Sequence, residues 1–220
     1  MCFWTEGLIR GRFNAAEHIS VDLRIKHMDT SRASLPSVYL VTPEPDGQFA
    51  AFIHQLEKSL IAGIRLVQFR AKTLEPALYE QLAVDVLACC RRHGAILLLN
   101  ADPALVDTLG ADGVHLDGTR LAAYRKRPLD AGKLVCAACH TVAQLKQAET
   151  IDADIATLSP VLLTASHPEA EPLGWKGFAD IAAQTSLPVY ALGGMRYQLL
   201  ECAQKNGAYG IAGIQAFWGG

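Results

Sequence analysis

The stretch LVQFRAKTLEPALYEQLAVDVLACCRRHGAILLLN, residues 66–100, decides the fold of this chain. It opens with a short apolar run, Leu66–Arg70, and closes with another, Ile96–Asn100. Both runs are too short for helices and suit buried strands. Between them, in Leu74–His93, apolar residues recur every three or four positions, which indicates an amphipathic helix. A strand, a helix and a second strand in this order predict a β-α-β unit with parallel strands.

Short apolar runs of the same kind recur from residue 37 to the end of the chain. The eight runs are Ser37–Thr42, Leu66–Arg70, Ile96–Asn100, Gly113–Asp117, Leu134–His140, Ile155–Val161, Pro188–Gly194 and Gly210–Gln215. Further helical patterns cover Val142–Thr150, Gly177–Gln184 and Tyr197–Asn206. Successive runs start 17 to 33 residues apart, which is too far for hairpins and suits helical crossovers.

Eight β-α units predict an α/β fold, a closed (β/α)8 TIM barrel. Near-continuous apolar strands agree with this fold, since they suit a parallel sheet covered on its outer face. The main alternative is an open, Rossmann-like sheet. It is disfavoured because no G-x-G-x-x-G follows the first predicted strand, where Val41-Thr42-Pro43-Glu44-Pro45 stands instead.

Composition narrows the class of protein. The chain has 220 residues, of which 50% are hydrophobic, and 20 Lys and Arg against 22 Asp and Glu give a net charge of −2. This balance argues against a basic nucleic-acid-binding surface. No apolar run approaches the roughly 18 residues of a membrane span, and scattered charges near residue 1 argue against a signal peptide. We therefore expect a cytoplasmic chain with neither nucleic acid nor membrane as a partner.

The first 35 residues differ from the rest, because they mix polar and charged types without a period of 2 or 3.6. We interpret residues 1–35 as an irregular leader or the remnant of a preceding domain, and residues 36–220 as the barrel.

In a barrel of this kind, chemistry sits at the carboxyl ends of the strands. Gln68, Arg70 and Lys72 share one face at the end of the second predicted strand. Placing such side chains toward the barrel interior is costly unless an anion neutralises them, which predicts a phosphate or pyrophosphate clamp. The alternative is a salt bridge at the rim with Asp102 or Asp117.

Two further strand ends suit phosphate. Gly193 and Gly194 follow the seventh predicted strand, and Ile214 and Gln215 end the eighth. Barrels commonly bind phosphate at these loops through backbone N–H groups, and glycine lets the backbone approach the anion closely. The alternative for the glycine pair is an ordinary turn entering a helix.

Histidines and carboxylates at other strand ends have competing interpretations. His140 ends the fifth predicted strand and suits general acid–base work, or it caps the helix that follows. His115, in mid-strand, is better explained as a buried structural residue. Asn100 and Asp102 suit polar substrate groups or Mg²⁺, although Asp102 could equally cap a helix starting at Pro103. No close cluster of His and carboxylates forms a metal signature, so no metal ligands are assigned.

Several motifs in this order carry a family resemblance. They are Val67–Lys72, Gly110–Leu116, Cys139-His140, Ser159-Pro160-Val161 with Thr164, Pro188–Met195 and Gly207–Ala212. Together they span about residues 37 to 217, and the chain resembles the thiamin phosphate synthase and thiazole tautomerase superfamily. That family has the (β/α)8 fold and acts in thiamin biosynthesis on small phosphorylated precursors.

The resemblance implies a role for each matching residue. The synthase joins a pyrimidine pyrophosphate to a thiazole phosphate with Mg²⁺ and releases pyrophosphate. Positions that hold the pyrimidine pyrophosphate match Gln68, Arg70, Lys72 and Asn100. The thiazole phosphate cradle matches Gly193, Gly194 and the backbone of Ile214 and Gln215. Thr164 matches a polar contact in the loop after the sixth strand.

The chain departs from the synthase pattern at the Mg²⁺ ligands. The residue after Asn100 is Ala101 where the synthase has Asp, and the second carboxylate position falls at Thr119 or Arg120. Mg²⁺ is thus the one cofactor that the resemblance implies, and its family ligands are missing, so full synthase activity is disfavoured. One alternative is the tautomerase branch, which needs no such pair and would use His140 to move protons on a thiazole phosphate. Another is a non-catalytic binding or sensor module.

A further stretch refines the resemblance. Ser159–Pro168 and Leu173-Gly174-Trp175 resemble a subgroup in which the barrel follows a Nudix hydrolase domain in one polypeptide. Met1–Leu35 contains no Nudix box, so a Nudix hydrolase domain is expected only as a partner outside this chain. A homodimer is left open by the sequence.

Overall fold

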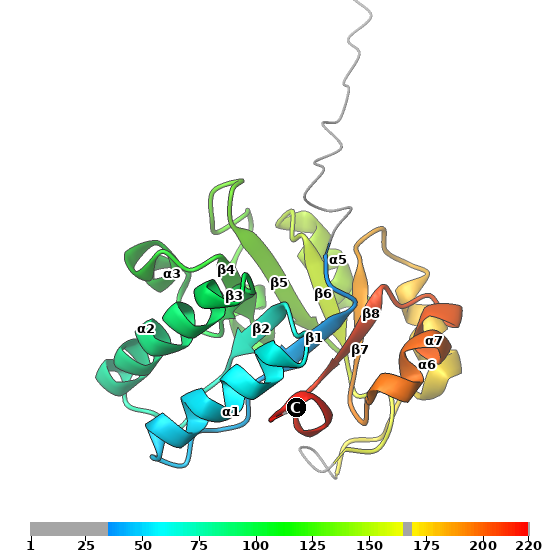
Figure 1. Ribbon diagram of the computed structural model, residues 1–220. Helices are drawn as coiled ribbons and strands as arrows, with labels where there is room; N and C mark the ends of the chain where they lie inside the picture. Colours follow the sequence, from blue (N-terminus) through cyan, green and yellow to red (C-terminus); the bar gives the residue numbers. More distant parts are fainter. Residues whose placement is uncertain (1–34, 165–168, 220) are drawn as a thin grey trace, which may run out of the picture. The chain divides into compact units, whose positions relative to one another are not determined.

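Eight parallel strands close into a barrel, in the order β1-β2-β3-β4-β5-β6-β7-β8 (Figure 1). The structure is a computed structural model and describes residues 35–164 and 169–219. The strands are β1 Val38–Val41, β2 Leu66–Phe69, β3 Ile96–Leu99, β4 Gly113–Leu116, β5 Leu134–Cys139, β6 Ile155–Leu158, β7 Val189–Leu192 and β8 Gly210–Gly213. Each lies within its predicted run, and β1 pairs with β8, so the predicted barrel is confirmed.

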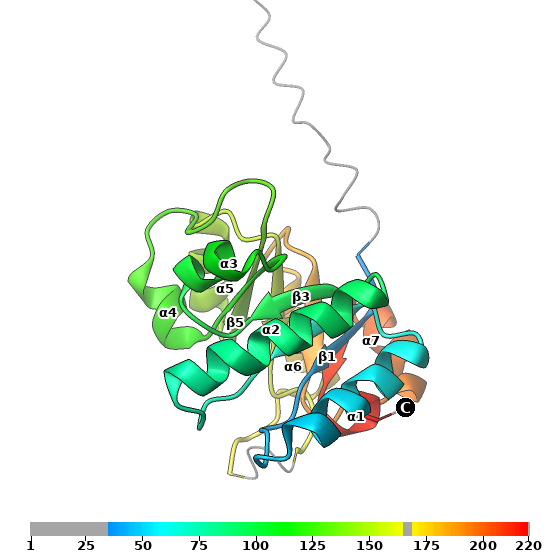
Figure 2. The same cartoon turned by 60° about the vertical axis from the view of Figure 1, so that its left-hand side comes forward.

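Helices alternate with the strands. In the described residues they are α1 Phe49–Ile61, α2 Pro76–Arg92, α3 Pro103–Leu109, α4 Gly118–Ala123, α5 Val142–Thr150, α6 Gly174–Ala182 and α7 Leu200–Lys205, with 3-10 turns η2 Tyr197–Leu199 and η3 Gln215–Phe217. Figures 1 and 2 show α1 and α2 side by side on the outer surface. Helix α5 has the predicted bounds, whereas α6 starts three residues earlier than predicted, at Gly174.

The core has two layers, because side chains alternate between the two faces of each strand. An inner layer fills the barrel and includes Tyr39, Leu98 and Tyr190. An outer layer lies between the strands and the helices. Cys136 belongs to the inner layer and Cys139 to the outer one, so the two thiols face opposite sides of β5.

The amino-terminal end of the barrel is closed by residues just before β1. Leu35 is buried in the inner layer, and its carbonyl accepts a 2.7 Å hydrogen bond from the hydroxyl of Tyr209. Tyr190 donates similarly to the carbonyl of Pro36, at 2.6 Å. The interpretation of residues 1–35 as a leader or domain remnant lies outside the described residues except at Leu35, which belongs to the barrel core. Within the described part of the chain, no helix is long and apolar enough to cross a membrane.

Candidate functional site

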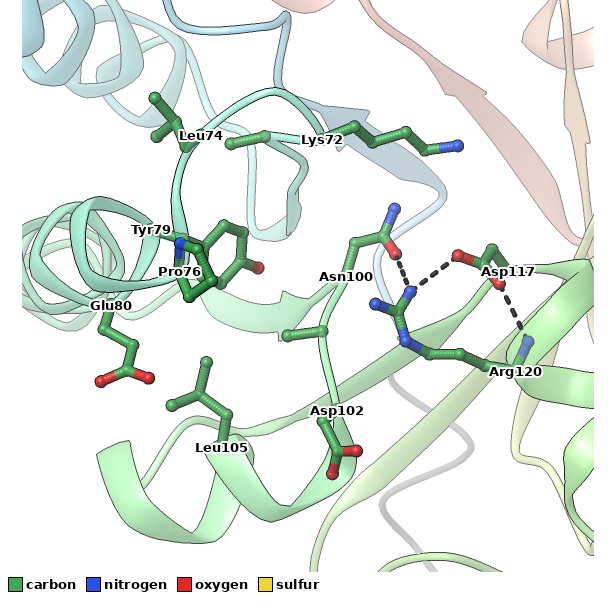
Figure 3. Close-up of a pocket in the computed structure, with 12 residues that line it drawn as sticks. Lys72, Leu74, Pro76, Tyr79, Glu80, Asn100, Asp102, Leu105, Asp117 and Arg120 are labelled. Carbon is green, nitrogen blue, oxygen red and sulfur yellow. Dashed lines mark hydrogen bonds and ion pairs between the residues drawn. The ribbon is translucent and has the colours of Figure 1, made fainter.

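A cavity of about 570 Å³ opens at the carboxyl ends of β2, β3 and β4 (Figure 3). Helices α2 and α3 bound it on the outer side. It is lined by Ala71, Lys72, Leu74, Pro76, Tyr79, Glu80, Asn100, Ala101, Asp102, Leu105, Asp117 and Arg120. Two residues predicted to hold pyrophosphate, Lys72 and Asn100, therefore line one pocket, as the strand-end rule anticipates.

One guanidinium links the ends of β3 and β4. Arg120 Nη1 donates to Asp117 Oδ2 at 2.7 Å and to Asn100 Oδ1 at 3.2 Å (Figure 3). Asp117 is the N-cap of α4, where its Oδ1 accepts from the backbone N–H of Arg120 at 3.0 Å. The Arg120 side chain remains 37% exposed, so the positive charge is accessible from the pocket. The family resemblance places a missing carboxylate at Thr119 or Arg120, and the pairing of Arg120 with Asp117 and Asn100 was not predicted from the sequence.

The pocket has two chemically different ends. Figure 3 shows Lys72 extending toward the side of Asn100, Asp117 and Arg120, and we call these four residues the cationic end. Glu80 lies on the other side of the pocket.

Asp102 has a structural role at the start of α3. Its Oδ1 accepts a 2.9 Å hydrogen bond from the backbone N–H of Ala104, and it is the N-cap of α3, which begins at Pro103. The capping interpretation of Asp102 is therefore confirmed.

Arg70 forms a salt bridge at the rim, but not with the predicted partners. Its Nη1 lies 3.2 Å from Glu44 Oε2, in the loop after β1, whereas Asp102 and Asp117 are engaged elsewhere. Burial alone would raise the pKa of Glu44, but hydrogen bonds from Thr73 and the charge of Arg70 lower it overall. The expectation of Asp102 or Asp117 is wrong because Glu44, 26 residues away in sequence, reaches Arg70 across the β1–β2 edge. The anion-binding role of Arg70 stays a prediction.

Gln68 is buried inside the barrel and does not line the pocket. It is only 3% exposed, and its Nε2 donates to the hydroxyl of Tyr39 at 3.4 Å. That hydroxyl lies 3.1 Å from Nδ1 of His115, which is also buried. The structural interpretation of His115 is confirmed, and Gln68 joins it in a hydrogen-bonded floor inside the barrel. Direct contact of Gln68 with a ligand stays a prediction.

The pKa of His115 depends on its burial and on the charged side chains near it. The pKa of His115 is lowered to about 3, mainly by burial; the charge of Asp117 opposes this, and the cations Lys72, Arg120 and Arg70 each add a smaller lowering. His115 is therefore neutral at physiological pH. Lys72, Arg120 and Arg70 thus all lie near enough to act on this buried ring, as does the opposing charge of Asp117.

His140 lies at the mouth directly after β5. Its Nδ1 is 2.8 Å from the carbonyl oxygen of Ser159 and 3.3 Å from the Ser159 hydroxyl. Because a carbonyl only accepts, Nδ1 carries the proton and Nε2 of the neutral ring is left as an acceptor. Helix α5 is capped by Thr141, whose hydroxyl accepts from the N–H of Gln144, so the interpretation of His140 as a cap is wrong.

On the opposite side of the mouth, the candidate residues contribute backbone groups rather than charged side chains. Gly193 and Gly194 have φ angles of 102° and 70°, in the left-handed region that favours glycine. A Cβ on Gly194 would lie 2.7 Å from the carbonyl oxygen of Leu163, and the carbonyl of Gly193 accepts from Leu162 N–H at 3.2 Å. The glycine pair thus packs against the loop after β6 and is more than a helix-entry turn.

Residues after β8 and β6 complete this side. Ile214 precedes the 3-10 turn Gln215–Phe217, and β7 pairs with β8, so their following loops are neighbours. We call Gly193, Gly194, Ile214 and Gln215 the backbone side. Thr164 is partly buried in the loop after β6. Phosphate binding by these five residues stays a prediction.

Known proteins match this chain across the barrel. The family model described as thiamine monophosphate synthase matches residues 38–217. A protein of Aquifex aeolicus named "Putative thiamine-phosphate synthase 2" is 38% identical over 184 residues, covering 83% of this chain and 98% of that protein. The thiamine-phosphate synthase of Thermus thermophilus is 33% identical, covering 83% and 89%.

The fold comparison agrees. The structure of thiamine phosphate pyrophosphorylase from Pyrococcus furiosus superposes with a TM-score of 0.68 at 20% identity, over 82% of this chain and 86% of that one. At this identity the likeness supports the fold alone. Some relatives are longer, and the chain spans about half of a Prochlorococcus marinus thiamine-phosphate synthase.

Proposed function

This chain belongs to the thiamine monophosphate synthase family, which supports a role in thiamin biosynthesis, and from that premise we propose that it binds phosphorylated thiazole and pyrimidine precursors at the barrel mouth. One observation carries the proposal: Lys72 and Arg120 converge with Asn100 on a single pocket at three neighbouring strand ends. Cations and amide groups at carboxyl strand ends suit a phosphorylated ligand. The cytoplasmic location and a homodimer stay predictions.

We propose that full synthase turnover is slow or absent. The supporting observation is that Ala101, and Thr119 or Arg120, stand where the resemblance places the two Mg²⁺ carboxylates. Arg120 already holds the oxygens of Asn100 and Asp117. Thiamin phosphate formation from both precursors with Mg²⁺ tests this. Turnover at the rate of an active family synthase, measured in parallel, would contradict the proposal.

The binding proposal is tested by calorimetry with each precursor in turn. We expect both precursors to bind to the wild-type chain, and Arg70→Ala to weaken the pyrimidine pyrophosphate if the clamp includes Arg70. Arg65→Ala is the matched control, because Arg65 hydrogen-bonds the carbonyls of Leu60 and Ile64 near the opposite end of β2. Absence of measurable heat for both precursors would reject the proposed function.

A second candidate is thiazole tautomerase activity. The hydrogen bond of His140 Nδ1 to Ser159 supports it, because it leaves Nε2 as a proton acceptor at the mouth. In an assay with a thiazole carboxylate phosphate, His140→Ala should abolish turnover, whereas His54→Ala, an exposed histidine of α1, should not. Equal rates for wild type and His140→Ala would remove His140 from this role.

A third candidate function is that of a non-catalytic sensor module, which would bind ligand at the same site without turning it over. It is favoured by the same missing carboxylates. The resemblance of Ser159–Pro168 and Leu173-Gly174-Trp175 to barrels fused to Nudix domains supports a Nudix hydrolase as its partner. It requires calorimetric binding of thiamin phosphate with no product under either assay. Turnover in the synthase or the tautomerase assay would reject it.

A further inference from the structure

We propose that Arg120 takes the place of a divalent cation in this pocket, so that the phosphate end of the ligand binds without metal. The inference rests on the proposed function for the class of ligand, phosphate or diphosphate esters. It concerns how the anion is neutralised in a chain that lacks the two Mg²⁺ carboxylates of the family pattern. The cationic end carries the argument.

The residues present do not fit Mg²⁺. A hard cation needs free oxygens, and Mg²⁺ is usually held through carboxylates. Asn100 Oδ1 and Asp117 Oδ2, the side-chain oxygens of the cationic end that could serve, both accept hydrogen bonds from Arg120 Nη1. The other Asp117 oxygen accepts from the backbone N–H of Arg120. Within residues 35–164 and 169–219, no group of three His, Cys, Asp or Glu could hold a metal.

The hydrogen bonds to Asn100 and Asp117 also fix the orientation of the Arg120 guanidinium. Both side-chain partners of Arg120 bind Nη1, and in the described structure Nη2 and Nε have no hydrogen bond to protein. Arg120 is fixed at its Nη1 edge while the opposite edge keeps donors for a ligand. Guanidinium groups bind phosphate oxygens by paired N–H donors, which suits this arrangement.

Charge at the site supports an anion. Asp117 is compensated by Arg120 at 2.7 Å, and Lys72 lines the same end with no carboxylate partner among residues 35–164 and 169–219. An incoming phosphate would meet Lys72 and one edge of Arg120 together.

Isothermal titration with inorganic pyrophosphate tests the inference. We expect the wild-type chain to bind pyrophosphate in EDTA, with no gain on adding Mg²⁺. Arg120→Ala should weaken this binding about tenfold or more, since charge-assisted hydrogen bonds are lost. Arg120→Lys, which keeps the charge, should weaken it less than Arg120→Ala. Arg125→Ala is the matched control, because Arg125 follows the same helix and bonds the carbonyls of Ala122 and Tyr124.

The outcomes separate the two proposals. Pyrophosphate binding that disappears in EDTA and returns with Mg²⁺ overturns the inference, as does unchanged affinity in a folded Arg120→Ala variant, with folding checked by circular dichroism. If pyrophosphate binds through Arg120 without metal but neither organic precursor binds, the inference stands and the proposed function fails. If the precursors bind only with Mg²⁺, the proposed function stands and the inference fails.

Discussion

The two sides of the barrel mouth that are predicted to bind phosphate are built in different ways. The cationic end uses charged side chains at the ends of β2, β3 and β4, and those side chains hold one another in place. The backbone side, after β7 and β8, relies on glycine geometry and the packing of two loops. Side-chain charges can be exchanged one at a time, whereas a backbone cradle depends on the chain path. The first side should therefore respond to mutation through affinity, and the second through stability as well.

The largest effect is expected at Gly194. Gly194→Ala adds a Cβ at φ 70° that would lie 2.7 Å from the Leu163 carbonyl oxygen. Left-handed strain and overpacking together should lower the free energy of unfolding by about 3 kcal/mol, measured by urea denaturation. Gly94→Ala is the control, because Gly94 has φ 61° with nothing within 4 Å of its Cβ position, and should cost about 1 kcal/mol. Equal losses in the free energy of unfolding for the two variants would contradict a special role for the packing of Gly194 against the loop after β6.

The sequence predicts the backbone of this molecule better than its contacts. Eight short apolar runs separated by crossover-length intervals predict all eight strands, because burial on both faces leaves a strong signal in each run. Helix α1 is not among the predicted helical patterns, although its buried residues, such as Phe52 and Leu56, follow helical spacing. That spacing was the signal that could have found it.

The pairings at the mouth are harder to predict. Strand-end position selects Lys72, Asn100 and Asp117, since it depends only on where each strand stops. It cannot show that Glu44 reaches Arg70, or that Arg120 turns back to Asn100, because these contacts depend on loop paths and rotamers between residues 20 or more apart. Partner identity thus needs the structure, while candidate positions do not.

The second prediction concerns the floor beneath the cationic end. His115 has a pKa of about 3 in the fold, through burial first, against an ordinary value near 6.5. The unfolded chain therefore binds a proton that the folded chain does not, and stability is lost as pH falls from about 6.5 toward 3. Between pH 7 and pH 5 the loss from this one group should be about 2 kcal/mol.

Urea denaturation at both pH values checks this prediction. His115→Gln keeps a side chain that can bond Tyr39 but cannot titrate, so its stability should fall by about 2 kcal/mol less than that of the wild type. Parallel losses in the two proteins would mean that His115 is protonated in the fold or accessible to water, and that the cations above it do not act on a buried neutral ring.

The third prediction separates affinity from stability at the cationic end. Lys72→Ala should weaken pyrophosphate binding about tenfold, because one charge-assisted contact is lost, and should leave the urea midpoint nearly unchanged. The loss should shrink as salt rises, since exposed charges are screened. Lys58→Ala, an exposed lysine of α1 outside the mouth, is the control. A large fall in stability for Lys72→Ala would show that the cationic end is as structural as the backbone side.

The smallest effect is expected at Asp102, where the question is whether a pocket carboxylate caps a helix or serves a ligand. Asp102→Ala removes the acceptor for Ala104 N–H at the start of α3 and should cost about 1 kcal/mol of stability. Asp102→Asn keeps a good cap without the charge, so it should restore most of that stability. Pyrophosphate affinity in EDTA should be the same or slightly higher in both variants, because a negative charge near the anion is removed. If both variants instead lost affinity and that loss depended on Mg²⁺, Asp102 would be a metal-binding carboxylate. The cationic end would then act through a metal rather than through its own side chains.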